Sequence, residues 1–131
     1  MRTESEMMAL ISTYVAKGLC RGELLYASDH LNDHVRPGLL RMLAWKAAIE
    51  SGAPIATGKS YKYLPGFLAP EVWEKLRHTC RNDTPENVWR ALSGCQDLFR
   101  TASIFISKTM SYPYPDYDGK VSAYLATLSK S

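Results

Sequence analysis

Apolar residues recur along most of the chain at alternating spacings of three and four, which is the period of an amphipathic helix. The clearest stripe consists of Val88, Leu92, Cys95, Phe99, Ala102 and Ile106. It is preceded by Thr84 and Pro85, residue types favoured at the N-cap and at the first helical position. The pattern predicts a long core helix that begins at Pro85.

A second long stripe runs from about Gly22 to Ser51. Its members are Leu24, Ser28, Leu31, Val35, Leu39, Met42 and Ile49. Pro37 lies inside this run, and proline has no backbone N–H to donate to the preceding turn. We therefore predict a kink or local break near Arg36.

Shorter helices complete the pattern. The first begins at a capping-box pattern, Thr3-x-x-Glu6, and its predicted apolar face consists of Met7, Ile11, Tyr14 and Val15. Pro70 and Glu71 open a short helix that reaches Cys80, and a last helix follows Asp118. Strand signals are weak, so the sequence predicts an all-α antiparallel bundle of about five helices in one domain, residues 1–131.

Composition and charge exclude several classes of protein. A net charge of +3 from scattered basic residues does not indicate nucleic-acid binding, and the apolar runs are too short to span a membrane. The N-terminus has no apolar segment typical of a signal peptide. Three cysteines far apart, Cys20, Cys80 and Cys95, are expected to be reduced and mostly buried thiols of a cytoplasmic protein.

Residues 51–70 form a connection of about twenty residues rich in Gly, Pro and Tyr. Loops of this length in compact domains are usually functional or disordered, and the aromatic residues of this one predict that it packs on a neighbour. Its Thr57–Ser60 segment is similar to the end of a phosphate-binding loop, but the motif requires glycine where Ala53 stands. Lys59 could still hold a phosphate as a point charge, or it could be a solvated lysine.

The segment Asp29–His34 repeats an Asp-His pair at a spacing of four, so both pairs share one helix face. Two histidines at this spacing can bind zinc or nickel, but no third ligand is evident. A solvated polar face is the simplest interpretation. A third interpretation is an acidic and aromatic strip formed by Glu23, Tyr26, Asp29 and Asp33, suited to a polycationic ligand rich in hydroxyl groups.

One other motif has catalytic spacing. Asp116-Tyr117-Asp118 has the Asp-x-Asp spacing of a two-metal nucleotidyl-transfer site. Such a site places both carboxylates on a strand beside a Gly-Ser turn, whereas this pair follows Tyr-Pro-Tyr-Pro and precedes a helix. A turn and helix cap explain it better. The residues alone predict no catalytic centre and no metal site.

Two blocks closely resemble the aminoglycoside 6-adenylyltransferase (streptomycin adenylyltransferase) family. One extends from Ser12 to Trp45, and the other is Gly58–Leu64, in which the family usually has Asn in place of Ser60. Shorter matches follow in order at Trp73–Leu76, Glu86–Trp89, Leu98–Arg100 and Tyr114–Asp118. The resemblance covers about residues 12–128.

The resemblance implies a two-domain enzyme of antibiotic resistance that transfers AMP from MgATP to streptomycin. An N-terminal nucleotidyltransferase domain binds MgATP, and a C-terminal helical domain closes over the drug. We expect residues 12–131 to be that substrate-binding domain and residues 1–11 to be a remnant of the family's N-terminus. The Gly-Ser turn and following Asp-x-Asp of the first domain have no counterpart, so we expect this chain alone to need no cofactor and to be inactive.

Placed on this sequence, the resemblance suggests Asp29 as a carboxylate that contacts the drug, or as the base for its hydroxyl in a complete enzyme. The other substrate-binding candidates are Glu23, Tyr26, Asp33 and Tyr61. Lys59 and Lys62 are the candidates for contact with the nucleotide.

We expect weak binding of the aminoglycoside streptomycin. We also expect a homodimer, formed through the helix face around Met7, Met8 and Ile11 or through the aromatics of residues 51–70. An alternative function is a helical interaction module that pairs with a separate nucleotidyltransferase subunit, and a third is a remnant without a present function.

Overall fold

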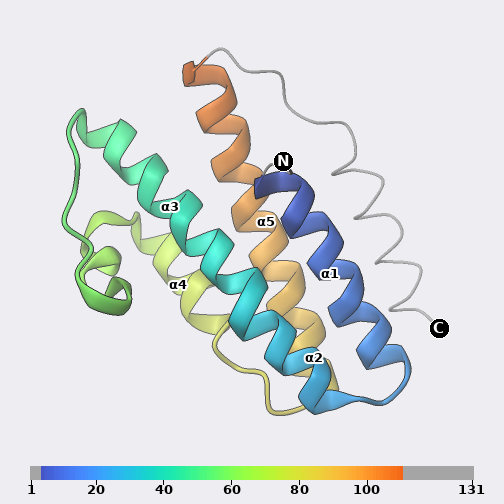
Figure 1. Cartoon of the computed structure of the whole chain (residues 1–131). Helices are drawn as coiled ribbons and strands as arrows, with labels where there is room; N and C mark the ends of the chain where they lie inside the picture. The colour runs from blue at the N-terminus through green and yellow to red at the C-terminus, as the bar shows by residue number, and fades with distance from the viewer. Residues whose placement is uncertain (1–3, 111–131) are drawn as a thin grey trace.

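The computed structural model describes the backbone of residues 4–110 and the side chains of residues 8–109, and this part of the chain is helical without strands (Figure 1). Its helices are α1 (Glu4–Cys20), α2 (Leu24–His30), α3 (Arg36–Ser51), α4 (Pro70–His78) and α5 (Pro85–Met110). Three short turns accompany them, namely the π-helical η1 (Leu31–Val35) and the 3₁₀ turns η2 (Lys59–Tyr61) and η3 (Leu64–Phe67). The all-α prediction is confirmed. The helix predicted after Asp118 and the Asp116–Asp118 pair lie outside the described residues.

The irregularity predicted near Arg36 is present as the π-helical turn η1 between α2 and α3, without a break in the helix. Pro37 has no N–H, so the carbonyl four residues earlier cannot receive its usual α-helical hydrogen bond. Widening the preceding turn lets the helix continue past the proline ring, and such π turns are frequent at functional sites. α2, η1 and α3 therefore form one continuous rod that carries Asp29 and Asp33 (Figure 1).

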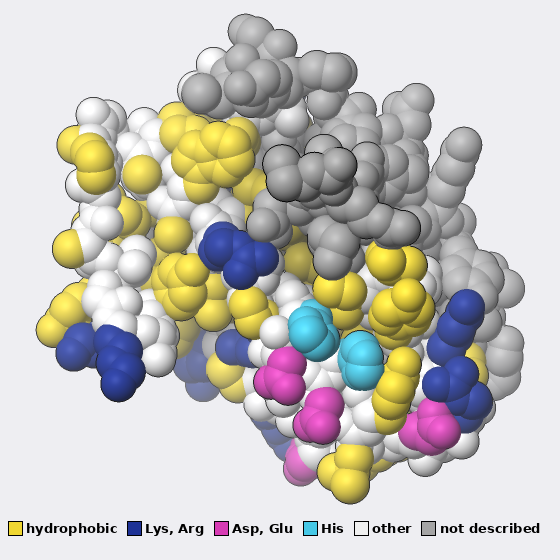
Figure 2. Space-filling model, in the orientation of Figure 1, with side chains coloured by type: hydrophobic (Ala, Val, Ile, Leu, Met, Phe, Trp, Pro, Cys, Tyr) yellow, Lys and Arg dark blue, Asp and Glu magenta, His cyan; other side chains and the backbone are white. Residues whose placement is uncertain are grey.

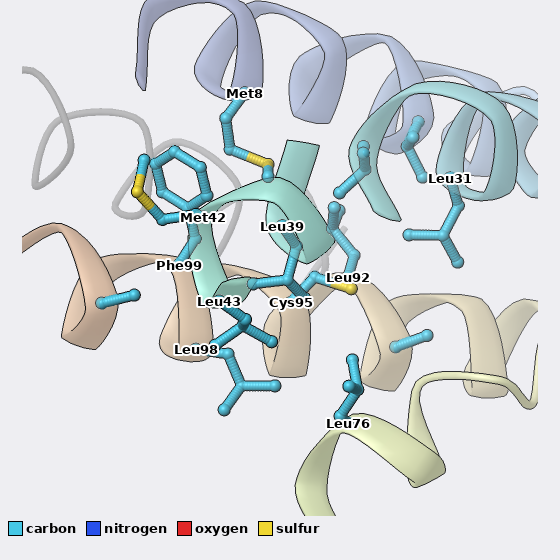
Figure 3. Packing of buried hydrophobic residues seen from close by; sticks show 14 of the residues in the cluster. Met8, Leu31, Leu39, Met42, Leu43, Leu76, Leu92, Cys95, Leu98 and Phe99 are labelled. Carbon is cyan, nitrogen blue, oxygen red and sulfur yellow. The ribbon is translucent and has the colours of Figure 1, made fainter. Parts of the chain in front are cut away.

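The core lies between this rod, α1, α4 and α5. α1 packs on α2 and η1, while α3 and α4 both pack on α5. Every residue of the predicted α5 stripe is buried, and these side chains meet Met8, Leu39, Met42 and Leu76 from the other helices (Figure 3). α5 begins as predicted, because the N–H of Asn87 donates to Thr84 Oγ1 at 3.1 Å.

The buried face of α1 agrees with the predicted one at Val15 and Ile11 and differs from it at Tyr14. Met8, Ser12, Val15 and Ala16 are buried, whereas Tyr14 is 38% exposed. The small side chains of Ser12 and Ala16 let α1 approach the rod closely, which a tyrosine at the contact would prevent. The side chain of Met7 lies outside the described residues, and the burial of Met8 removes it from the surface predicted for a dimer.

The connection between α3 and α4 packs on the core, as its aromatic composition predicts. Leu64 is buried, and Tyr61 and Leu68 contact the core cluster. Tyr63 and Phe67 remain exposed, so this loop offers apolar surface for the self-association predicted above.

None of the three cysteines forms a disulfide, and only Cys95 is buried. The prediction of mostly buried thiols is therefore wrong for Cys20 and Cys80, which are exposed. Cys80 follows the end of α4, where helical spacing no longer indicates which side chains are buried. Among the described residues, no helix is both long and apolar enough to cross a membrane.

Candidate functional site

The acidic and aromatic strip lies on the exposed face of α2 and η1. Asp29 and Asp33 are exposed there and stand one helical turn apart. Neither carboxylate has an ion-pair or hydrogen-bond partner among residues 4–110. Figure 2 shows two histidine rings side by side on this face with acidic side chains next to them. Two uncompensated negative charges on one face attract a polycation.

An aromatic ladder runs beside these carboxylates. The ring centroids of Tyr26 and His30 are 4.2 Å apart, and those of His30 and His34 are 5.5 Å apart. Tyr14 meets His30 edge-on at 6.1 Å, and His30 Nδ1 is 3.0 Å from the carbonyl oxygen of Tyr26. The ladder forms a wall of rings along one side of the strip, suited to packing against the apolar face of a sugar ring.

The ladder depends on a glycine in α1. A Cβ atom placed on Gly18 would lie 2.7 Å from Tyr26 Cδ1, which is closer than real contacts allow. Only glycine at this position lets the Tyr26 ring lie flat against α1. Gly18 also accepts the N–H of Glu23 at 2.8 Å, so the same residue closes the turn between α1 and α2.

Glu23 stands in a different electrostatic setting from Asp29. Arg21 Nε donates to Glu23 Oε1 at 2.7 Å, and the guanidinium carbon lies 5.6 Å from the centroid of the Tyr26 ring. The hydrogen bond to Glu23 raises the pKa of Arg21 above its ordinary value. Glu23 is therefore already paired with a cation, so it supports the strip less directly than Asp29 does.

A polar network that sequence reasoning missed anchors the strip to the α4–α5 connection. Asn82 Nδ2 donates to Asn32 Oδ1 at 3.0 Å, and Ser28 Oγ donates to Asn82 Oδ1 at 3.1 Å. Arg36 donates to Thr79 Oγ1 and, at 3.3 Å, to Cys80 Sγ. These partners are more than 40 residues apart in sequence, so no local pattern could reveal them.

The connection of residues 51–70, called the lysine loop after Lys59 and Lys62, has an unusual backbone conformation. Ser60 and Tyr61 have positive φ angles of 57° and 60°, which non-glycine residues rarely adopt. Asparagine tolerates this conformation better than serine does. Lys59 and Lys62 are exposed, and Lys62 Nζ lies 5.0 Å from the Tyr63 ring centroid. Strain of this kind clusters at ligand-binding sites.

The two groups of candidate residues lie apart. The strip is on α2 and η1, whereas the lysine loop follows the opposite end of the rod, after α3 (Figure 1). The fold therefore brings Glu23, Tyr26, Asp29 and Asp33 into one surface but does not add Lys59, Tyr61 and Lys62 to it. No cluster of three or more His, Cys, Asp or Glu side chains suited to a metal ion occurs in the described part of the chain.

The chain is similar to known adenylyltransferases. The family model for streptomycin adenylyltransferase matches residues 9–128. The aminoglycoside 6-adenylyltransferase of Bacillus subtilis is 44% identical over 115 residues, which cover 88% of this chain and 40% of that protein. The aminoglycoside 6-adenylyltransferase of Campylobacter jejuni is 41% identical over 119 residues, covering 91% of this chain and 41% of that protein.

Solved structures agree with these matches. The crystal structure of an aminoglycoside 6-adenyltransferase from Bacillus subtilis superposes with a TM-score of 0.87 at 39% sequence identity. The superposition covers 99% of this chain and 52% of that one. The chain thus spans about two fifths of the length of its curated relatives.

Proposed function

Because the chain belongs to the streptomycin adenylyltransferase family, we propose that its helices supply the aminoglycoside-binding surface of an enzyme that transfers AMP from MgATP to the drug. The observation that carries this proposal is the exposed pair Asp29 and Asp33, which has no cationic partner among residues 4–110. Aminoglycosides carry several cationic nitrogens and many hydroxyl groups, and carboxylates form charge-assisted hydrogen bonds to both.

Within this surface the residues have different proposed roles. Asp29 and Asp33 bind cationic groups of streptomycin, and the ladder of Tyr26 and His30 packs against a sugar ring. Glu23 orients Arg21 at the end of the strip. In a complete enzyme, Asp29 is also our candidate for the base that accepts the proton of the reacting hydroxyl. Lys59 and Lys62, with Tyr61 between them, are proposed to face the nucleotide phosphates.

Replacing Asp29 with asparagine is expected to weaken streptomycin binding by about three- to fivefold, because an exposed carboxylate contributes modestly to holding a cation. The measurement is calorimetric titration of the chain with streptomycin at low salt. Raising NaCl from about 50 to about 300 mM should remove most of the remaining affinity through screening.

The matched control for this titration is Glu71→Gln, which removes one negative charge from the exposed start of α4, away from the strip. It should leave the affinity unchanged. Equal weakening in both variants would show that only overall charge attracts the drug, and that the strip is an ordinary solvated face.

The purified 131-residue chain is expected to produce no pyrophosphate from ATP and streptomycin. Nucleotidyl transfer needs metal ions held by paired carboxylates beside the triphosphate, and no such pair on a strand occurs among residues 4–110. Pyrophosphate release measured with and without the drug tests this expectation. Drug-dependent turnover that disappears in Asp116→Asn would contradict it, and turnover only after addition of a separate nucleotidyltransferase domain would favour the interaction-module alternative.

A further inference from the structure

A hollow, the α4–α5 cleft, lies between the end of α4 and the first half of α5. It has a volume of about 350 Å³ and includes Lys75, Arg81, Arg90, Ser93 and Asp97 in its lining. None of the residues of the acidic strip or of the lysine loop lines it. Its charge is opposite to that of the strip, so it must recognise a different kind of ligand.

The only carboxylate in the lining is already neutralised. Lys75 Nζ lies 3.2 Å from Asp97 Oδ2, and Arg100 Nη1 lies 3.4 Å from Asp97 Oδ1. Two acidic side chains outside the lining have partners as well. Glu74 pairs with Arg77 at 2.7 Å and with His78 at 2.9 Å, and Asp83 accepts a hydrogen bond from Asn87 at 2.7 Å.

Two cations of the cleft have no hydrogen-bonded or short ion-pair partner in the described part of the chain, although the charge of Asp83 acts on Arg81. The exposed guanidinium groups of Arg81 and Arg90 have no hydrogen-bond or ion-pair partner among residues 4–110. The hydroxyl of Ser93, also exposed, adds a donor without a partner in the same part of the chain. Arginine presents a planar fork of N–H donors that matches the oxygens of a phosphate group.

The backbone at this end of α4 does not oppose an anion. A helix C-terminus normally exposes carbonyl oxygens, which repel negative charge. Here the carbonyl of Leu76 accepts both the N–H and the hydroxyl of Thr79, and the carbonyls of Arg77 and His78 accept the N–H groups of Cys80 and Arg81. The tightened last turn therefore leaves fewer bare acceptors near the cleft.

We propose that the α4–α5 cleft binds a small anion that contains phosphate groups, held by the guanidinium groups of Arg81 and Arg90 and by the hydroxyl of Ser93. The volume is large enough for a diphosphate unit and not only for a single phosphate. The diphosphate can come from inorganic pyrophosphate or from the phosphate chain of a nucleotide. This site is independent of the proposed aminoglycoside surface, because no residue is shared between them.

Calorimetric titration of the full chain with inorganic pyrophosphate, at low salt and without added metal, tests the site. The double variant Arg81→Gln, Arg90→Gln should bind pyrophosphate at least about tenfold more weakly, because two charge-assisted contacts are lost. Both side chains are exposed, so the variant should keep the melting temperature of the parent chain.

The control is Arg77→Gln, which removes one positive charge from α4 at a residue that pairs with Glu74 and does not line the cleft. Unchanged pyrophosphate affinity in this control supports the site. Equal loss in the control and the double variant, or no binding of pyrophosphate by the parent chain, overturns it.

Titration with ATP in place of pyrophosphate distinguishes the two sources. Similar affinities for both ligands, with both lost in the double variant, support recognition of the phosphate chain itself. If the double variant loses pyrophosphate binding but keeps ATP binding, the nucleotide binds elsewhere and the ligand of the cleft is inorganic pyrophosphate.

Discussion

Replacing Leu39 with alanine is expected to lower the free energy of unfolding by about 2–5 kcal/mol, enough to remove much of the stability of a domain of this size. Leu39 is fully buried on α3 and lies in the cluster where α1, α3 and α5 meet (Figure 3). Truncation removes buried methyl groups and leaves a cavity that the surrounding helices can fill only in part. Urea unfolding followed by circular dichroism measures the change.

Leu25→Ala is the matched control for this change, because Leu25 is 79% exposed on α2 and loses the same atoms. Its free energy of unfolding should stay within about 0.5 kcal/mol of the parent chain. If both substitutions lowered the free energy of unfolding equally, Leu25 would have to be buried as well. That result would contradict this packing of the bundle.

The thiol of Cys95 is expected to react with a disulfide reagent at least about a hundredfold more slowly than those of Cys20 and Cys80 near pH 8. Burial raises the pKa of Cys95 to about 11 from an ordinary value of 9.0, although the nearby charge of Arg36 acts in the opposite direction. The thiolate is the reactive form, and the fraction of thiol present as thiolate falls about tenfold for each unit by which the pKa rises. We expect two rapidly reacting thiols in the native chain and three in urea.

The same burial makes stability depend on pH. The pKa of Cys95 is higher in the folded chain than in the unfolded chain. As the pH rises, the thiol of the unfolded chain therefore loses its proton first. The contribution of this thiol to stability is therefore complete below about pH 9 and is lost between about pH 9 and 11. Comparing the unfolding of the parent chain and of Cys95→Ala over this range isolates the effect, because every other titrating group is common to both. Identical pH dependence in the two chains would contradict it.

Local sequence determined the helices and several of their boundaries. The stripe from Val88 to Ile106 is buried along its whole length, and Thr84 caps α5 where the sequence places the cap. Pro37 likewise marks the irregular turn of the rod. These features depend on helical periodicity and on the chemistry of single residues, and both act over one or two turns. They can therefore be read without knowledge of the neighbouring helices.

The candidate site could be predicted only in part. The spacing of Asp29 and Asp33 places them on one face, because residues four apart adjoin one another on a helix. Sequence also proposed Lys59, Tyr61 and Lys62, but the structure leaves that loop at the opposite end of the rod. Spacing fixes neighbours within an element, whereas the distance between elements depends on how they pack.

Only the tertiary structure decided which face of α1 is buried and what anchors the strip. The period of α1 permits either Tyr14 or Ser12 to face the rod, and close approach of the backbones selects the smaller side chain. Asn82 reaches Asn32 across 50 residues of sequence, and Arg81 and Arg90 share a cleft only because α4 packs on α5. Such contacts join residues from different helices, so they arise from the packing of whole elements and leave no periodic trace in the sequence of either one.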